Sequence, residues 1–350
     1  MSDFEETNLF AQQAANVRKS RWIVAAFVVF FAWLGFGGDA IVWIAAKRGA
    51  QVPWQPGFPL LGVAMTVIGI GLVMYVRRSG AQKVLWSAGA AELVDAKTDE
   101  EQRFRNVAEE MAIAAGVPMP KLWVVEDPDP NAFATGNDPL NSHVAVTSGL
   151  LAVLDRDELQ AVVGHEYGHI KNYDTQLMTT LAALVGAVVL MRDGVGRAMR
   201  YGGFGGGGRR GRKKGADPIV LILLVVWVIS WILAPLVINM LALWVSRKRE
   251  FLADAMSAQF TRNPMALAKA LEKINAAHAP TLSIKGGVAH MCIADPLGRK
   301  LTEREGRFAD AFATHPSMSV RIARLKAMAF QSAKRAQSQG PSASGVAPTL

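Results

Sequence analysis

Cysteine is almost absent from this sequence, which has one, Cys292, in 350 residues. A single cysteine excludes disulfide bonds within the chain. It also lies outside any metal-ligand spacing, which disfavours a closed structural zinc site, because such sites take four protein ligands that commonly include cysteine. Cys292 is more typical of a small buried residue than of a nucleophile.

The sequence also lacks a basic patch interleaved with aromatic residues, although its formal net charge is +9. Its lysines and arginines gather beside apolar runs, as membrane flanks do, so we expect no nucleic-acid partner. The exception is the Gly/Arg-rich loop 201–215, which could bind RNA as RGG-like segments do. A flexible basic connector beside lipid is the favoured interpretation, because the repeat is short.

Long apolar runs are abundant, and 51% of the residues are hydrophobic, which is high for a soluble enzyme. Trp22–Ala46 and Phe58–Val76 are each long enough to span a bilayer, and they predict a transmembrane hairpin. No small-residue cleavage site follows the first run cleanly, so we interpret it as an anchor rather than a cleaved leader. Two further runs, 177–191 and 218–245, flank the Gly/Arg-rich loop, and Pro235 breaks the second of them.

The most informative segment is His165-Glu166-Tyr167-Gly168-His169. Its flanks show helical periodicity, and Asp155 with Glu158 resembles a capping box at the start of the helix. Residues four apart share a helix face, so His165 and His169 can hold one metal ion while Glu166 takes a proton from water. This pattern predicts the core of a zinc hydrolase.

A second segment supplies the missing ligand. A catalytic zinc site of this type needs a third protein ligand, and Glu250 can provide it from another helix. Asp254, four residues later, can accept the free ring N–H of His165. Because His169 precedes one apolar run and Glu250 follows the next, the two runs must form a hairpin that returns to its starting side. The alternatives for this hairpin are that it crosses the bilayer fully, that it is partly embedded, or that it packs over the catalytic domain. The alternative without a metal is that Glu250 lies on a solvated helix face and forms an ion pair with Arg247 or Arg249.

The remaining segments predict a water-soluble domain. A helix is expected from Asp99 to Ala115, and another from Pro264 to about Ala277 with Asn263 as its cap. Lys121–Val125 and His143–Val146 are strand candidates on either side of a turn-rich segment, and they predict a small antiparallel sheet. Its edge strand could align an extended peptide through main-chain hydrogen bonds, or the strands could merely cover the metal helix.

Together these motifs resemble the HtpX family of membrane zinc endopeptidases, relatives of the CAAX prenyl proteases. The resemblance spans about residues 20 to 328. Besides the two apolar hairpins, it is carried by the segments 130–136, 147–151, 165–169, 249–254 and 314–317 and by Arg321. It implies a gluzincin-type domain that faces the cytoplasm of a bacterium from the inner membrane and cleaves membrane proteins, often misfolded ones. The long Gly/Arg-rich loop departs from the short loop expected in this family.

The resemblance carries roles over to individual positions. His165, His169 and Glu250 are expected to bind one Zn²⁺ per chain, Glu166 to act as general base, and Asp254 to support a ligand. His315 and Arg321 match a family motif near the active site, where such groups could stabilise the oxyanion. The family's substrate-binding edge corresponds to Asn131, Ala132 and Phe133.

The expected protein is mainly helical, α+β and membrane-anchored, and it hydrolyses peptide bonds of membrane or misfolded proteins in quality control. The alternative is a non-catalytic membrane scaffold with a structural zinc ion. The expected divisions of the chain are a polar start and hairpin (1–79), a first catalytic part (80–176), a second apolar hairpin (177–245), a second catalytic part (246–330) and a disordered tail (331–350).

Overall fold

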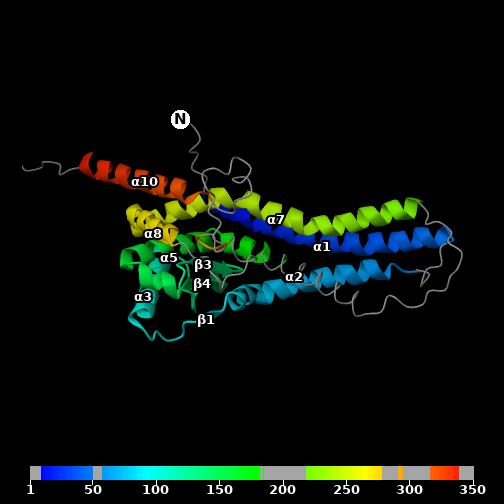
Figure 1. Ribbon diagram of the computed structural model, residues 1–350, viewed down its shortest axis with the longest axis horizontal. Helices are drawn as coiled ribbons and strands as arrows, with labels where there is room; N and C mark the ends of the chain where they lie inside the picture. Colours follow the sequence, from blue (N-terminus) through cyan, green and yellow to red (C-terminus); the bar gives the residue numbers. More distant parts are fainter. Residues whose placement is uncertain are drawn as a thin grey trace, which may run out of the picture.

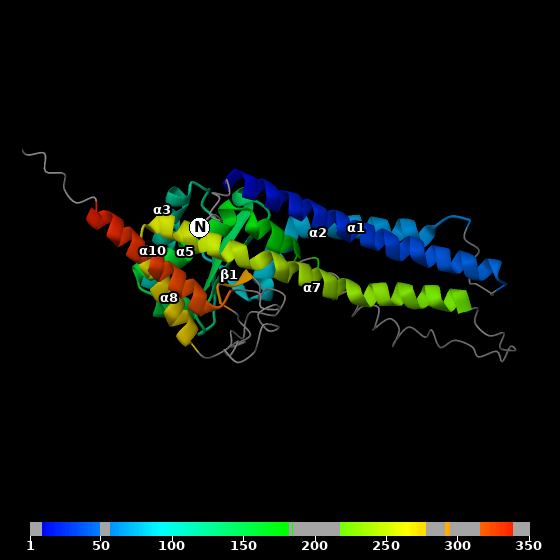
Figure 2. The ribbon, with the colours of Figure 1, turned by 90° about the horizontal axis from the view of Figure 1, so that it is seen from above.

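The computed structural model describes residues 9–49, 57–181, 184, 218–277, 291–294 and 316–338. Three long helices extend together from a compact part that holds the sheet and the shorter helices (Figure 1). These long helices are α1 (Leu9–Lys47), α2 (Leu60–Ser87) and α7 (Pro218–Thr261). A view from above shows α7 running from the far end of the long helices into the compact part (Figure 2).

The α1–α2 hairpin is held closely at its far end. The carboxylate of Asp39, the one charge in the first apolar run, accepts hydrogen bonds from the backbone N–H groups of Leu61 (3.3 Å) and Gly62 (2.7 Å). It therefore satisfies donors at the start of α2, which has no side-chain cap of its own. A Cβ on Gly35 would lie 2.4 Å from the carbonyl oxygen of Leu61, so the two helices touch there through backbone atoms.

Both α1 and α2 are long and apolar enough to cross a membrane. The third long helix packs against them, and the indole N–H of Trp227 in α7 donates to the carbonyl oxygen of Leu34 in α1 at 2.8 Å. The apolar run before Glu250 continues through Pro235 as part of α7, so the expected break there is wrong. The Gly/Arg-rich loop 201–215 lies outside the described residues.

The sheet is mixed, and the expectation of a purely antiparallel sheet is wrong. Its order is β1-β2-β4-β3, and only β2 and β4 pair in parallel. The reason is that β3 and β4 form a hairpin around a short 3₁₀ turn, η1 (Pro139–Asn141), and β4 inserts beside β2. The strands are β1 (Ala90–Glu92), β2 (Lys121–Val125), β3 (Ala132–Gly136) and β4 (Ser142–Thr147).

The expected strands at 121–125 and 143–146 are confirmed as β2 and β4. The edge strand β3 lies inside the segment whose composition indicated turns, because pairing with β4 outweighs the weak strand preference of its small residues. All five of its residues are buried. The strand in closest contact with the predicted metal helix is therefore one that local propensity does not reveal.

The predicted metal helix is α5 (Arg156–Lys171), and α3 (Asp99–Ala115) and α8 (Pro264–Ala276) pack against it. The other shorter helices are α4 (Ser148–Val153) and α10 (Met318–Ser338). The helices expected at 99–115 and from 264 are confirmed, with Gly116 in the left-handed conformation at the end of α3 and Asn263 capping α8. The segment from Gln331 is not disordered at its start, because α10 continues to Ser338 through good helix formers.

Candidate active site

The helix α5 carries the first two candidate ligands. Its predicted capping box is present, since the side chain of Asp155 accepts from the N–H of Glu158 and the side chain of Glu158 accepts from the N–H of Asp155. Nearly every later residue of α5 is buried. One turn apart on this helix, His165 and His169 direct their Nε2 atoms to within 3.2 Å of each other.

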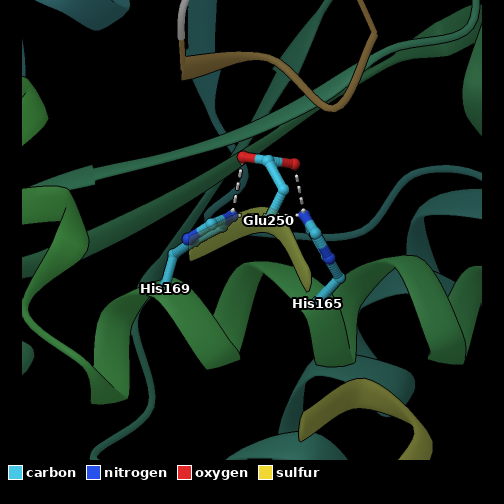
Figure 3. A group of neighbouring side chains, drawn as sticks. All are labelled: His165, His169 and Glu250. Carbon is cyan, nitrogen blue, oxygen red and sulfur yellow. Dashed lines mark hydrogen bonds and ion pairs between the residues drawn. The ribbon is translucent and has the colours of Figure 1, made fainter. Parts of the chain in front are cut away.

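A carboxylate from α7 completes the group (Figure 3). Glu250 places Oε2 3.6 Å from Nε2 of His165 and Oε1 3.5 Å from Nε2 of His169. One ligand atom from each of the three residues lies within 4.8 Å of the others. The close packing of α5 on α7 permits this approach, since a Cβ on Gly168 would lie 3.2 Å from the Cα of Ala253.

These three side chains fit a catalytic metal ion. Two imidazole nitrogens and one carboxylate are the donor set of His₂Glu zinc sites, which keep a further position for water or substrate. A bound cation would offset the charge of the buried Glu250 carboxylate and would be coordinated by the two imidazole rings, which have little contact with solvent. The donor chemistry and the convergence of the atoms therefore agree with a metal centre.

Glu166 lies between the two histidines in sequence and faces a cavity together with His169. The cavity is lined by Glu166, His169 and Glu250, by Ala134 of β3, and by other residues that include Met178 and Met291. Glu166 is 1% exposed, and neither of its carboxylate oxygens has a hydrogen-bond partner among the residues described. Burial raises the pKa of this carboxyl, against the lowering effect of His165 and His169.

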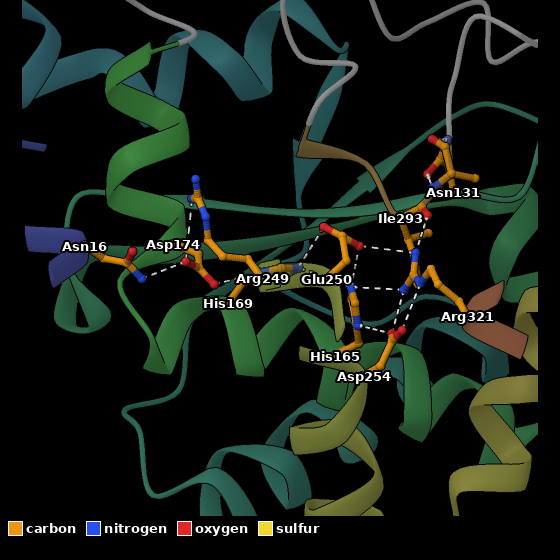
Figure 4. Close-up of polar contacts among 11 residues, drawn as sticks. Asn16, Asn131, His165, His169, Asp174, Arg249, Glu250, Asp254, Ile293 and Arg321 are labelled. Carbon is orange, nitrogen blue, oxygen red and sulfur yellow. Dashed lines mark hydrogen bonds and ion pairs between the residues drawn. The ribbon is translucent and has the colours of Figure 1, made fainter. Parts of the chain in front are cut away.

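His165 is in contact with Asp254 and Arg321 (Figure 4). Its Nδ1 lies 3.0 Å from Oδ1 of Asp254, as expected for the partner of a ligand histidine. Burial alone lowers the pKa of His165, but hydrogen bonds to the carboxylates of Asp254 and Glu250 outweigh it and raise that pKa to about 9. The imidazole is therefore held in a strongly anionic environment that also suits a metal cation.

Arg321 is completely buried and does not line the cavity. Its guanidinium donates to both carboxylate oxygens of Asp254, at 3.0 and 2.7 Å, and to the carbonyl oxygen of Ile293 at 3.2 Å. It also lies 3.2 Å from Oε2 of Glu250. Arg321 thus contacts two carboxylates of the site, and its Nη2 also lies 3.5 Å from Nε2 of His165, so it lies beside the candidate ligand atoms themselves.

The partner of His169 was missing from the sequence interpretation. Asp174 Oδ2 lies 3.2 Å from Nδ1 of His169, and Arg249 lies 3.6 Å from the other oxygen of Asp174. The available signal was an acidic residue shortly after the second histidine, in a turn where Tyr173 adopts a φ of 59°. This left-handed turn directs the chain back past the end of α5.

The expected substrate edge is partly covered by the chain's own residues. Asn131 donates from Nδ2 to the carbonyl oxygen of Ala294 at 3.2 Å, and Ala132 accepts from the N–H of Ile293 at 2.9 Å. Phe133 pairs with Cys292 in an isolated antiparallel bridge. Cys292 is buried, and Ala134 is the residue of β3 that lines the cavity. His315 lies outside the described residues.

The site defines a class of protein, a metal-dependent hydrolase of the His-Glu-x-x-His type with an acidic third ligand from a separate helix. Sequence comparison then gives the family, since the model of peptidase family M48 matches residues 98–329. The chain belongs to peptidase family M48. It is therefore a metallopeptidase, which hydrolyses peptide bonds in protein substrates and requires a metal cofactor.

Relatives match almost the whole chain. A "Protease HtpX homolog" of Caldanaerobacter subterraneus subsp. tengcongensis is 38% identical over 321 residues, which cover 91% of this chain and 98% of that protein. A protein of the same name from Streptococcus gordonii is 35% identical over 322 residues, covering 91% of this chain and 100% of its own. The predicted HtpX-like character is thus confirmed.

Among solved structures, the crystal structure of S. mikatae Ste24p is similar at 17% sequence identity with a TM-score of 0.44. The similarity covers 87% of this chain and 66% of that one.

Proposed function

We propose that this protein is a membrane-bound zinc endopeptidase in which Glu166 is the general base. The observation that carries the proposal is the convergence of His165, His169 and Glu250 beside a cavity that Glu166 also lines. A zinc ion held by these three residues would supply a Lewis acid and lower the pKa of water in contact with it.

The chain's own residues account for the remaining steps. Glu166 accepts a proton from the attacking water and delivers it to the nitrogen of the leaving peptide, so the amide bond is replaced by a carboxylate and an amine. Burial suits it to this role, because a raised pKa makes its carboxylate a stronger base than an exposed one. Asp254 holds Nδ1 of His165 so that Nε2 faces the site, and Arg321 holds Asp254.

We further propose that the substrates are membrane proteins or misfolded proteins. The cavity adjoins the long helices: Met178 lines it, and Leu184, two turns later, packs with Phe31 of α1 and Val73 of α2. A peptide would approach β3 in extended form, and Ala134 is the point at which this strand meets the cavity. The segment 291–294 already contacts Asn131, Ala132 and Phe133. A substrate peptide could therefore pair with these three residues only if that segment moved away, or it could pair with the outer side of that segment instead.

The first experiment compares the full-length wild type in detergent with Glu166→Gln, measuring bound zinc and cleavage of an unfolded model protein. We expect one zinc ion per chain in both and cleavage by the wild type alone, with a loss of about 10³-fold or more. Asp157→Asn is the matched control, because it makes the same chemical change at an exposed position of α5. Retained turnover in Glu166→Gln, in protein free of contaminating proteases, would contradict the assignment of the base.

The third ligand is tested in the same preparation. Glu250→Ala should lose zinc, whereas Glu272→Ala, which removes an exposed carboxylate on α8, should keep one ion per chain. A full zinc content in Glu250→Ala would mean that another residue supplies the third ligand.

A further inference from the structure

The N-terminal part of α1, before its long apolar stretch, lies against the end of the metal helix α5. The last carbonyl groups of a helix have no partners within it. Two amide side chains of α1 supply donors here: Gln13 to the carbonyl oxygen of Lys171 at 2.8 Å, and Asn16 to that of Asn172 at 2.9 Å. Gln13 and Asn16 are three residues apart and therefore share one face of α1.

Asn16 reaches further than Gln13. The same Nδ2 atom of Asn16 also donates to Oδ1 of Asp174 at 2.8 Å (Figure 4). The other carboxylate oxygen of Asp174 lies 3.2 Å from Nδ1 of His169. Asn16 and Asp174 are 7% and 2% exposed, so solvent does not substitute for these contacts.

We propose that Asn16 and Asp174 form a positioning relay for His169, so that the first helix of the membrane hairpin completes the metal site. The proposal rests on the zinc site proposed above. A carboxylate at Nδ1 of a histidine fixes the ring orientation and keeps the proton on that nitrogen, which leaves Nε2 for the metal. Asn16 fixes the carboxylate in turn.

The arrangement parallels the support of the other histidine. His165 contacts Asp254, which Arg321 binds, and His169 contacts Asp174, which Asn16 binds from α1. A buried carboxylate needs such partners, because its desolvation is otherwise unfavourable. The difference is that Asn16 comes from a helix that continues into the membrane hairpin, whereas Arg249, 3.6 Å from the same oxygen of Asp174, comes from α7. Docking of the hairpin against α5 and the affinity for zinc are therefore coupled.

The test compares full-length Asn16→Ala, Asn16→Asp and Asp174→Asn with wild type in detergent. Zinc affinity is measured by competition with a chelator, and the geometry of the site by the visible absorption of the Co²⁺-substituted protein. We expect Asp174→Asn to bind zinc about 10- to 100-fold more weakly, the usual effect of losing such a partner. Asn16→Asp should weaken it similarly through repulsion, and Asn16→Ala by several-fold. All three should change the cobalt spectrum.

Gln13→Ala is the matched control. It removes the same kind of bond between α1 and the end of α5 but no contact with Asp174, so we expect its zinc affinity and cobalt spectrum to match wild type. Equal losses in Gln13→Ala and Asn16→Ala would overturn the relay in favour of general docking. Wild-type affinity and spectrum in the Asn16 variants would overturn it outright. A wild type that binds no zinc would instead contradict the proposed function.

Discussion

At the residue scale, the site is distinguished by buried charges that satisfy one another. Arg321, Asp254 and Glu250 are each almost inaccessible, and the guanidinium bridges the two carboxylates. Breaking such a group by removing one member leaves an uncompensated charge, which is far more costly than losing an exposed pair. The contacts of Arg321 with Asp254 are two parallel hydrogen bonds that only the planar fork of arginine can make.

Replacing this arginine by lysine tests the geometry separately from the charge. We expect Arg321→Lys to bind zinc about 10- to 100-fold more weakly and to unfold at a lower temperature, because lysine keeps the cation but cannot bind Asp254 and Glu250 together. Arg324→Lys is the control on α10, since Arg324 is exposed and its guanidinium stacks on the ring of Phe251 at 3.8 Å without a recorded contact to Asp254 or Glu250. Unchanged zinc affinity in Arg321→Lys, measured by chelator competition, would show that the charge of Arg321 suffices.

At the element scale, the distance between α5 and α7 decides whether the third ligand reaches the histidines. Gly168 faces the backbone of Ala253, about one turn from Glu250, and a Cβ on Gly168 would lie 3.2 Å from the Cα of Ala253. Gly164, one turn earlier on α5, faces the side chains of Met111 and Ser257 at 3.4 Å. Of these two glycines, only Gly168 is so close to the backbone of α7 that an added side chain must displace that backbone.

The two glycines should therefore respond differently. Gly168→Val should push α7 away and weaken zinc binding about tenfold or more, because metal sites tolerate displacements of only about 0.2 Å in ligand distance. Gly164→Ala should leave zinc affinity unchanged and raise the free energy of unfolding by up to about 1 kcal/mol, the helix preference of alanine over glycine. Zinc titration and denaturant unfolding of both variants decide the matter. Equal zinc affinities in the two variants would contradict the prediction.

At the scale of the whole molecule, the α1–α2 hairpin is in direct contact with the compact part, since Gln13 and Asn16 of α1 donate hydrogen bonds to the end of α5. The basic residues of the hairpin are concentrated toward the compact part, where Arg18, Lys19 and Arg21 precede the apolar part of α1 and Arg77 and Arg78 follow that of α2. Lys47 and Arg48 lie at the far end. For the α1–α2 hairpin taken alone, this asymmetry predicts that the compact part faces the cytoplasm, whereas the eight lysines and arginines of segment 192–214 are not part of this count.

Labelling of single cysteines tests this orientation. In a Cys292→Ala background, we expect Arg48→Cys to react with a membrane-impermeant thiol reagent added to intact spheroplasts. Lys97→Cys, in the compact part, should react only after the membrane is disrupted. The reverse pattern would place the compact part outside the cytoplasm.

The sequence by itself determined the features that depend on local spacing. A four-residue spacing puts His165 and His169 on one helix face, and side-chain caps define where α5 and α8 begin. These signals act over a few residues, so they survive without knowledge of the fold.

Tertiary structure decided the features that depend on partners distant in the chain. The parallel pairing of β2 with β4, the strand β3 within a turn-rich segment, and the contact of Asn16 with Asp174 are of this kind. None has a local signature, because each is stabilised by a surface that exists only once other elements have packed. The same reason explains why only the structure shows where Arg321, recognisable as a motif residue, lies: in contact with Asp254, Glu250 and His165 and outside the cavity lining.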